Sequence, residues 1–178
     1  MRIVSGALKG RRFSPPKNFK ARPTTDFAKE NIFNVLNNII DFEDIEVLDL
    51  FSGIGSISYE FASRGCSRII AVENNFKHFK FITELVKELN LGEQINVIKS
   101  CAFRYVRKTS ATFNIVFADP PYNSKEAETL PEEVMNSGIL KPGGMFIFEH
   151  SDKKNYSHLS GFSEVRRYGK VNFSVFLV

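Results

Sequence analysis

Strand-like and helical segments alternate from Ile45 onward, and this alternation constrains the fold more than any other feature of the sequence. Short apolar runs lie at 45–50, 68–72, 95–98, 113–118 and 144–148, and helical patterns lie at 56–64, 77–90, 103–108 and 126–136. This order predicts parallel strands joined by right-handed helical crossovers. The final runs, 164–167 and 171–177, flank a glycine turn and predict an antiparallel hairpin. We therefore expect an α/β fold with a seven-stranded, mostly parallel, doubly wound sheet.

The first 41 residues do not follow this alternation. Residues 1–13 alternate loosely around two glycines and predict a short hairpin, which Pro15-Pro16 ends. Thr25 or Asp26 is the expected N-cap of a helix over about 27–40. Its expected buried residues are Phe27, Ile32, Phe33, Leu36 and Ile40. No linker separates this part, so we expect residues 1–41 to form a small extension packed on a domain of residues 42–178.

The positive charge of the chain is concentrated in this extension. The net charge is +4, yet residues 1–25 contain seven cations and no acid. The seven, our candidate polyanion-binding residues, are Arg2, Lys9, Arg11, Arg12, Lys17, Lys20 and Arg22. A basic arm on a nearly neutral body is typical of a polyanion-binding extension. A solvated tail that only adds solubility is the alternative.

Length and composition exclude several other classes of protein. The 178 residues make about one domain. Cys66 and Cys101 lie far apart and indicate reduced thiols, because neither a disulfide framework nor a zinc site has such spacing. The three histidines also lack metal-ligand spacing. Since no long apolar run or signal-like segment is present, we expect a cytoplasmic protein with no metal and no membrane span.

The apolar run 113–118 ends in the sequence Asp119-Pro120-Pro121-Tyr122. An acid after a buried strand points into the crevice where open α/β sheets bind ligands. Proline has no N–H group, so the Pro120 carbonyl and the Asp119 carboxylate can both accept hydrogen bonds from one amino group. Tyr122 offers a flat ring for base stacking. This loop predicts a site for an amine on a nucleobase; the plainer interpretation is a turn whose aspartate caps the next helix.

A second loop, 49–56, follows the first strand of the alternation. Gly53 and Gly55 allow a ligand to approach the backbone, and Glu73, about twenty residues later, can accept both hydroxyls of a ribose. A dinucleotide site would have a third glycine where Ser58 stands, and Asp49 would repel a pyrophosphate but suit a cationic amino acid. The pattern therefore favours S-adenosylmethionine over NAD as the cofactor.

Further motifs extend over nearly the whole chain. They are Met1-Arg2-Ile3-Val4-Ser5-Gly6, Lys9-Gly10-Arg11-Arg12, Arg22-Pro23-Thr24-Thr25-Asp26, Lys29-Glu30, Phe33-Asn34, Ser63-Arg64-Gly65 and Asn123. With the two loops, they resemble the RsmD family of bacterial enzymes, which methylate the 2-amino group of a guanine in 16S ribosomal RNA. The resemblance implies a Rossmann-like class I S-adenosylmethionine-dependent methyltransferase fold. It also implies that the partner is 16S rRNA in the small ribosomal subunit or its assembly intermediate, and we expect a monomer.

The two loops and the resemblance together assign the site residues. Asp119 and Pro120 would hold the amino group, and Tyr122 would lie under the base, which must be unpaired or flipped out. The expected cofactor-binding residues are Asp49, Phe51, Ser52, Gly53, Gly55, Glu73, Asn74, Cys101, Ala102 and Asp119. Phe76, near the ribose-binding turn, is the helix phenylalanine expected to reach adenine.

The chain departs from the family pattern in two places. Where the family commonly has FAGSG, this chain has Phe51-Ser52-Gly53-Ile54-Gly55, and both glycines are kept. Where the family usually has an acid that holds the adenine amino group, this chain has Cys101. A thiol is a weak hydrogen-bond partner, so we expect Cys101 only to line the pocket.

Three other functions are compatible with the same residues. The first is adenine-N6 methylation of DNA or RNA, which the lack of a separate target-recognition domain argues against. A protein-amide methyltransferase is disfavoured because such enzymes usually have asparagine at the position of Asp119. The third is a ribosome-assembly RNA-binding protein in which methylation is lost or incidental, and the Cys101 departure is its best support.

Overall fold

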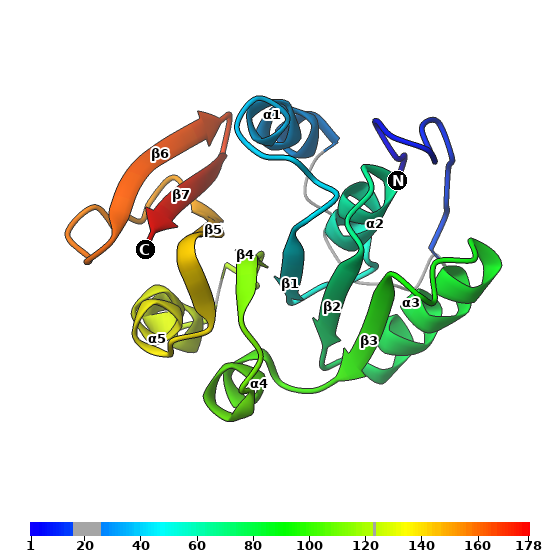
Figure 1. Cartoon of the computed structure of the whole chain (residues 1–178). Helices are drawn as coiled ribbons and strands as arrows, with labels where there is room; N and C mark the ends of the chain where they lie inside the picture. The colour runs from blue at the N-terminus through cyan, green and yellow to red at the C-terminus, as the bar shows by residue number, and fades with distance from the viewer. Residues whose placement is uncertain (16–25, 123) are drawn as a thin grey trace.

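A seven-stranded mixed sheet forms the centre of the protein. The computed structural model describes residues 1–15, 26–122 and 124–178. The strands are β1 (Glu46–Leu50), β2 (Arg68–Glu73), β3 (Ile95–Lys99), β4 (Phe113–Ala118), β5 (Leu140–Ser151), β6 (Phe162–Tyr168) and β7 (Val171–Leu177), in the order β3-β2-β1-β4-β5-β7-β6 (Figure 1). Strands β1 to β5 are parallel, and β7 is antiparallel to both β5 and β6. The predicted sheet and its closing hairpin are confirmed.

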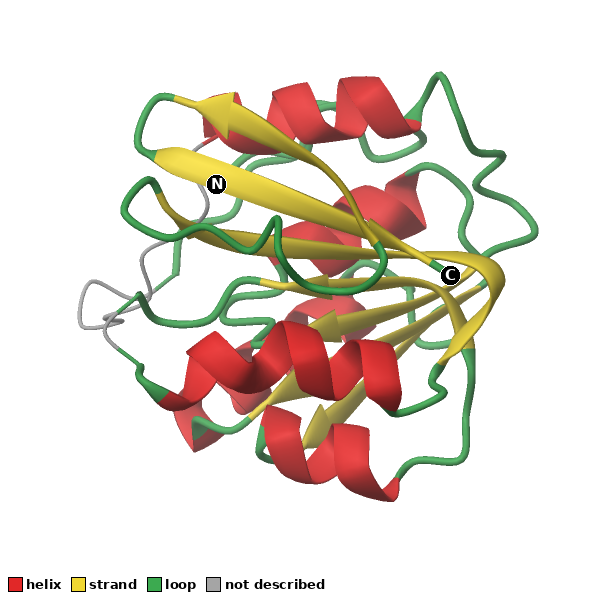
Figure 2. Ribbon diagram, turned by 90° about the vertical axis from the view of Figure 1, so that its left-hand side faces the viewer, coloured by secondary structure: helices red, strands yellow, loops and turns green. Residues whose placement is uncertain are grey.

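Helices cover both faces of the sheet (Figure 2). One face packs against α1 (Asp26–Leu36), α2 (Ser56–Ser63) and α3 (Phe76–Glu88). The other face packs against α4 (Ala102–Lys108) and α5 (Leu130–Asn136). A short 3₁₀ helix, η1 (Glu126–Thr129), precedes α5. Successive strand residues point to opposite faces. Ile115 and Phe117 belong to the hydrophobic core on the side of α1, α2 and α3, and Val116 and Ala118 belong to the core on the side of α4 and α5. Both faces of each central strand are therefore buried, as a parallel sheet requires.

The largest differences from the predicted elements concern α1 and β5. The first helix ends at Leu36, and turns follow to Ile39, so the predicted end at residue 40 is wrong. Ile32, Phe33 and Leu36 are buried as predicted, but Ile40 is half-buried and Phe27 is 64% exposed. The expected strand 144–148 is part of β5, which runs from Leu140 to Ser151. Strand β5 is long because its second half pairs with β7, up to the pair of Ser151 with Val171.

The N-terminal segment folds back on itself and packs on α2. Residues Arg2 and Arg12 form a single antiparallel bridge, so the predicted hairpin is present only as this one pair. At its tip, Gly6 has a φ of +80°, and a Cβ atom there would lie 1.8 Å from the Ser63 carbonyl oxygen. The Ser63 hydroxyl donates to the Ser5 carbonyl at 2.6 Å. Since Ser63 ends α2, the tip lies at the amino-terminal edge of the parallel strands.

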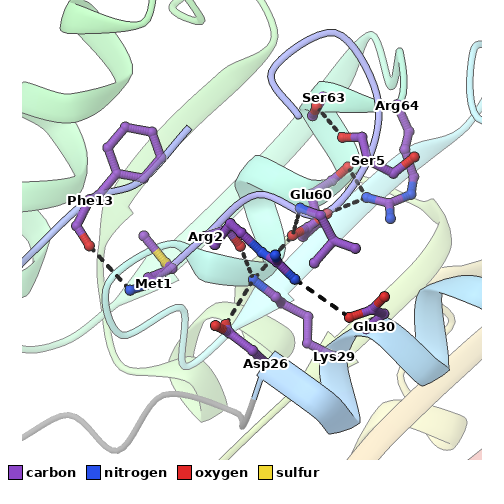
Figure 3. Close-up of polar contacts among 11 residues, drawn as sticks. Met1, Arg2, Ser5, Phe13, Asp26, Lys29, Glu30, Glu60, Ser63 and Arg64 are labelled. Carbon is purple, nitrogen blue, oxygen red and sulfur yellow. Dashed lines mark hydrogen bonds and ion pairs between the residues drawn. The ribbon is translucent and has the colours of Figure 1, made fainter. Parts of the chain in front are cut away.

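A buried ion network fixes this segment to α1 and α2 (Figure 3). Glu60 and Lys29 are both fully buried, and the Lys29 ammonium lies 3.1 Å from the Glu60 carboxylate. Lys29 also donates to the Arg2 carbonyl at 2.7 Å, and Glu60 accepts from the Val4 N–H at 2.8 Å. Arg64 pairs with Glu60 and lies over the Phe33 ring, 4.3 Å from its centroid. The extension therefore shares a hydrophobic and ionic core with residues after 42.

The described part of the chain contains no helix long and apolar enough to cross a membrane.

Candidate active site

The β1–α2 loop is wound tightly by three residues with positive φ. Phe51, Gly53 and Gly55 have φ values of 60°, 58° and 81°. A Cβ atom at Gly55 would lie 2.7 Å from the Tyr59 ring, so only glycine fits there. The Ser52 hydroxyl bonds the backbone carbonyls of Asp49 (2.8 Å) and Val72 (3.1 Å), which ties the loop to β2. The loop is thus a rigid turn at the carboxyl ends of β1 and β2.

Asp49, the expected partner of a cationic amino acid, lies beneath this loop. Its side chain is 2% exposed, and one carboxylate oxygen accepts from the Ser58 N–H at 3.1 Å and from the Ser58 hydroxyl at 2.5 Å. Burial raises the pKa of Asp49 to about 7, and the nearby Glu73 carboxylate adds to this, while the Ser58 bonds oppose it. A positive ligand charge beside Asp49 would restore its ionised form.

Glu73 connects the end of β2 to the glycine loop. One of its oxygens accepts from the Gly53 N–H at 2.8 Å and the other from the Asn75 N–H at 2.6 Å. Both oxygens keep lone pairs that can accept from ribose hydroxyls, because a carboxylate has about four acceptor positions. Asn74 is exposed beside it, and Phe76, 61% exposed, begins α3. The structure thus brings a diol acceptor and an open aromatic ring to one place.

Two buried polar atoms at the glycine loop fit a polar cofactor. Among the described residues, Ser56 Oγ and Tyr59 Oη are buried and have no hydrogen-bond partner. Buried polar atoms are normally paired, so each is a position that a bound ligand or water would satisfy. Ser56 is the first residue of α2, and the N-cap residue Gly55 offers no side-chain cap to its N–H groups. The residues present therefore fit S-adenosylmethionine.

Cys101 and Ala102 lie after β3, where the adenine ring is expected. Cys101 is half-buried at the N-cap position of α4, and its thiol makes no capping hydrogen bond. Ala102 is buried. Strand β3 ends beside β2, with Lys99 paired to Glu73. That Cys101 lines the adenine pocket stays a prediction.

The Asp119 loop follows β4, which lies between β1 and β5. In the register, Ala118 pairs with Leu50 on one side and with Phe148 on the other. Asp119 is half-buried, Pro120 is buried and Pro121 is exposed. Because β1 and β4 are adjacent and parallel, Asp119 lies next to the loop that starts at Phe51. The structure therefore places the expected amine acceptors beside the expected cofactor site.

Glu149 holds the Tyr122 side chain. The Tyr122 hydroxyl donates to the Glu149 carboxylate at 2.8 Å, and Glu149 is 3% exposed on β5. Together with Pro120, Pro121 and His150 they line a small pocket. Sequence reasoning missed Glu149, since the expected strand ended at Phe148. The available signal was its position, one residue beyond the register partner of Ala118.

His150 has a structural environment. Its ring nitrogens lie 2.8 Å from the Ser151 carbonyl and 2.8 Å from the Ser174 hydroxyl, and burial lowers its pKa. No group of three metal-ligating side chains occurs in residues 1–15, 26–122 and 124–178.

The candidate polyanion-binding residues, expected to bind the RNA, divide into three groups. Arg2 and Arg12 are exposed at the backbone bridge, next to the start of α1, where Arg2 lies 3.7 Å from Glu30. Lys9 and Arg11 are also exposed, but Lys9 is near the tip, which lies at the opposite edge of the sheet from Asp119. Lys17, Lys20 and Arg22 fall outside the described residues, as does the expected N-cap Thr25. The described cations thus belong to the segment that packs on α2.

Comparisons with known proteins agree with the resemblance seen in the sequence. The profile of a family described as conserved hypothetical protein 95 matches residues 1–177. The ribosomal RNA small subunit methyltransferase D of Escherichia coli is 31% identical over 149 residues, which cover 84% of this chain and 71% of that protein.

Two solved structures show the same fold. A hypothetical protein from Thermus thermophilus superposes with a TM-score of 0.85 at 23% identity, over 100% of this chain and 99% of that one. An RNA methyltransferase from Salinibacter ruber, in complex with S-adenosyl-L-homocysteine, superposes with a TM-score of 0.69 at 13% identity, over 88% and 93% of the two chains. The predicted Rossmann-like class I methyltransferase fold is confirmed.

Proposed function

The chain belongs to the family described as conserved hypothetical protein 95, and on this basis we propose that it is an S-adenosylmethionine-dependent methyltransferase acting on the 2-amino group of a guanine in 16S ribosomal RNA. The observation that carries this proposal is the position of Asp119 and Pro120 at the end of β4, beside the glycine loop of β1. The similarity to ribosomal RNA small subunit methyltransferase D supports the substrate. The small ribosomal subunit or its assembly intermediate is the proposed partner.

The cofactor-binding role falls to residues along the ends of β1, β2 and β3. Asp49 would pair with the α-ammonium group, and Glu73 with the ribose hydroxyls. The exposed Phe76 ring and the half-buried Cys101 would contact the adenine. Bound S-adenosylmethionine supplies an electrophilic methyl group. The rigid Phe51–Gly55 turn would fix its orientation before the base arrives, which lowers the entropic part of the barrier.

The methyl-accepting nitrogen must be activated by the Asp119 loop. An aromatic amino group is a weak nucleophile because its lone pair is delocalised into the ring. Hydrogen bonds from this group to the Asp119 carboxylate and the Pro120 carbonyl would turn the lone pair toward the methyl group. The negative carboxylate would also stabilise the positive charge that develops on the nitrogen. Tyr122 would support the base by stacking, with its hydroxyl held by Glu149.

The proposal is tested by methyl transfer from labelled S-adenosylmethionine to small ribosomal subunits that lack the modification, followed by nucleoside analysis. We expect the label in 2-methylguanosine. Label in N6-methyladenosine would replace the substrate with an adenine and keep the amine chemistry. Saturable cofactor binding without any label would favour an RNA-binding assembly factor and contradict the proposal.

Cofactor affinity should depend on the ionisation of Asp49. Because the pKa of Asp49 in the free protein is raised to about 7, its carboxyl group is protonated below that pH and must lose a proton to pair with an ammonium group. Affinity for S-adenosylmethionine should therefore rise about tenfold per pH unit from pH 5.5 to about pH 7 and level off above it. Isothermal titration calorimetry across this range measures the slope.

A matched variant and a matched ligand control the pH experiment. Asp49→Asn should bind about 10- to 100-fold more weakly at pH 8 and show no pH slope, because it lacks the charge. In wild type, 5′-methylthioadenosine should show no slope either, since it has no amino acid part. An equal slope in Asp49→Asn would assign the titration to another group. Between pH 4 and pH 7 the Asp49 carboxyl is protonated in the folded state but ionised in the unfolded state. Without ligand, its contribution to the free energy of unfolding should therefore fall as the pH rises through this range, and Asp49→Asn should lack this contribution.

The Tyr122–Glu149 hydrogen bond gives a separate prediction. Tyr122→Phe keeps the ring but removes the hydroxyl that Glu149 holds at 2.8 Å. We expect kcat to fall about 5- to 20-fold with little change in cofactor affinity, because a looser ring positions the base less well. Glu149→Gln keeps an acceptor for the hydroxyl and should retain most of the activity. Steady-state kinetics on small subunits measures both, and wild-type kcat in Tyr122→Phe would show that the hydroxyl is dispensable.

A further inference from the structure

The exposed ring of Phe27 lies at the same edge of the sheet as the candidate active site. Strands β4 and β5 are parallel and end at Ala118 and Ser151. Ser151 pairs with Val171, and Val171 pairs with Tyr168, so the β6–β7 turn lies at this carboxyl edge. The Phe27 ring packs edge-on against Tyr168, with centroids 6.3 Å apart. Figure 1 shows α1 beside the end of β6.

Two exposed cations lie next to Tyr168 at the end of the hairpin. Arg167 precedes Tyr168 on β6 and points to the other face of the sheet, and Lys170 lies in the β6–β7 turn. Neither forms an ion pair with any residue of the described ranges. The neighbouring Arg166 is paired with Glu164 at 2.6 Å. We call Phe27, Arg167, Tyr168 and Lys170 the hairpin surface. It combines an open ring with two cations that have no neighbouring carboxylate as a partner.

The acidic groups near the hairpin surface are already neutralised. Asp26 lies 3.6 Å from the Lys29 ammonium, and Glu30 lies 3.7 Å from the Arg2 guanidinium. The excess charge of the surface therefore comes from Arg167 and Lys170.

We propose that the hairpin surface binds single-stranded RNA next to the modified nucleotide, with Phe27 stacking on a base and Arg167 and Lys170 contacting phosphates. Proteins hold single strands by stacking bases on aromatic rings and by binding phosphates with cations. Here Phe27 lies on one face of the hairpin end, Arg167 on the other and Lys170 in the turn between them. From β4 to β6 there are three strand spacings, about 14 Å, so a strand that enters the site at Asp119 passes this surface. The assignment rests on the proposed function and adds a second RNA contact, separate from the residues expected to bind the cofactor.

Binding of a 16S rRNA transcript at several salt concentrations tests the hairpin surface. The double variant Arg167→Gln/Lys170→Gln should bind more weakly and reduce the slope of log affinity against log salt by about 1.4, since each single-strand phosphate contact contributes about 0.7. Phe27→Ala should lose about tenfold in affinity with no change of slope, because stacking releases no counterions. Phe27→Tyr should retain binding.

Lys87→Gln is the matched control, because Lys87 is exposed in the last turn of α3 at the opposite edge of the sheet. If the double variant has the slope and affinity of Lys87→Gln, the surface does not bind RNA. Circular dichroism identifies any variant that fails to fold. If Phe27→Ala fails to fold, the double variant, whose substitutions are at exposed residues, decides the proposal. Methyl transfer by wild type is measured separately. Its absence would contradict the proposed function, but the differences in RNA affinity between the variants would still test the hairpin surface.

Discussion

The Asp119→Ala variant should transfer methyl groups about 10²- to 10³-fold more slowly than wild type at saturating cofactor, the usual cost of removing one group that stabilises developing charge. Asp119 is half-buried at the end of β4, beside the β1 loop, so in the proposed function its carboxylate would meet the base where the methyl group arrives. S-adenosylmethionine affinity should change little, because Asp49 and Glu73 make the expected charged contacts. Single-turnover kinetics with labelled cofactor measures the transfer step itself.

Two variants control the Asp119 experiment. Asp119→Asn keeps one carbonyl oxygen and loses the charge, so a rate between those of wild type and Asp119→Ala would separate hydrogen bonding from charge stabilisation. Asp152→Ala removes an exposed carboxylate just after β5 and should leave the rate unchanged. Near-normal turnover in Asp119→Ala would remove this residue from the mechanism.

The alternation of strands and helices was sufficient to predict the sheet because each element carries its own periodic pattern. Strand β4, for example, is an apolar run with one polar residue, Asn114, and no tertiary information is needed to recognise it. The same holds for the positive φ at Gly53 and Gly55, since the glycines themselves indicate a tight turn. The loops that follow these strands could therefore be placed at one edge of the sheet from sequence.

Three features depend on contacts between distant residues. Phe27 lies nine residues, about two and a half turns, before Leu36, so it is on the side of α1 opposite the buried face, and only its contact with Tyr168 required the fold. Glu149 follows an apolar run and is positioned by Tyr122, 27 residues earlier. Lys29 lies on the buried face of α1 with Ile32, Phe33 and Leu36, and its partner there is Glu60, 31 residues later. In each case the sequence pattern indicates the local element, and the distant partner appears only in the fold.

The buried Lys29–Glu60 pair gives the largest expected effect on stability. Lys29→Met should lower the free energy of unfolding by about 3 kcal/mol, because the buried Glu60 carboxylate would lose the cation at 3.1 Å and keep only Arg64 as its charged partner. The Arg2 carbonyl would also lose its bond from Lys29, which helps to fix the N-terminal segment. Urea denaturation followed by circular dichroism measures the change.

Removing the charge of Glu60 as well should recover part of this loss. In Lys29→Met/Glu60→Gln, the amide oxygen can still accept from the Val4 N–H, the buried carboxylate is removed, and Arg64 keeps its bond to the backbone carbonyl of residue 60 at 2.9 Å. Lys80→Met is the matched control, since Lys80 and Glu84 form an ion pair in which both side chains are 65% exposed, and its loss should cost about 0.5 kcal/mol or less. Equal unfolding midpoints for Lys29→Met and Lys80→Met would mean that the buried network contributes no more than a surface pair. A large loss in Lys29→Met alone would show that the buried network, which joins α1 and α2 to the backbone of Arg2 and Val4, contributes far more stability than a surface pair.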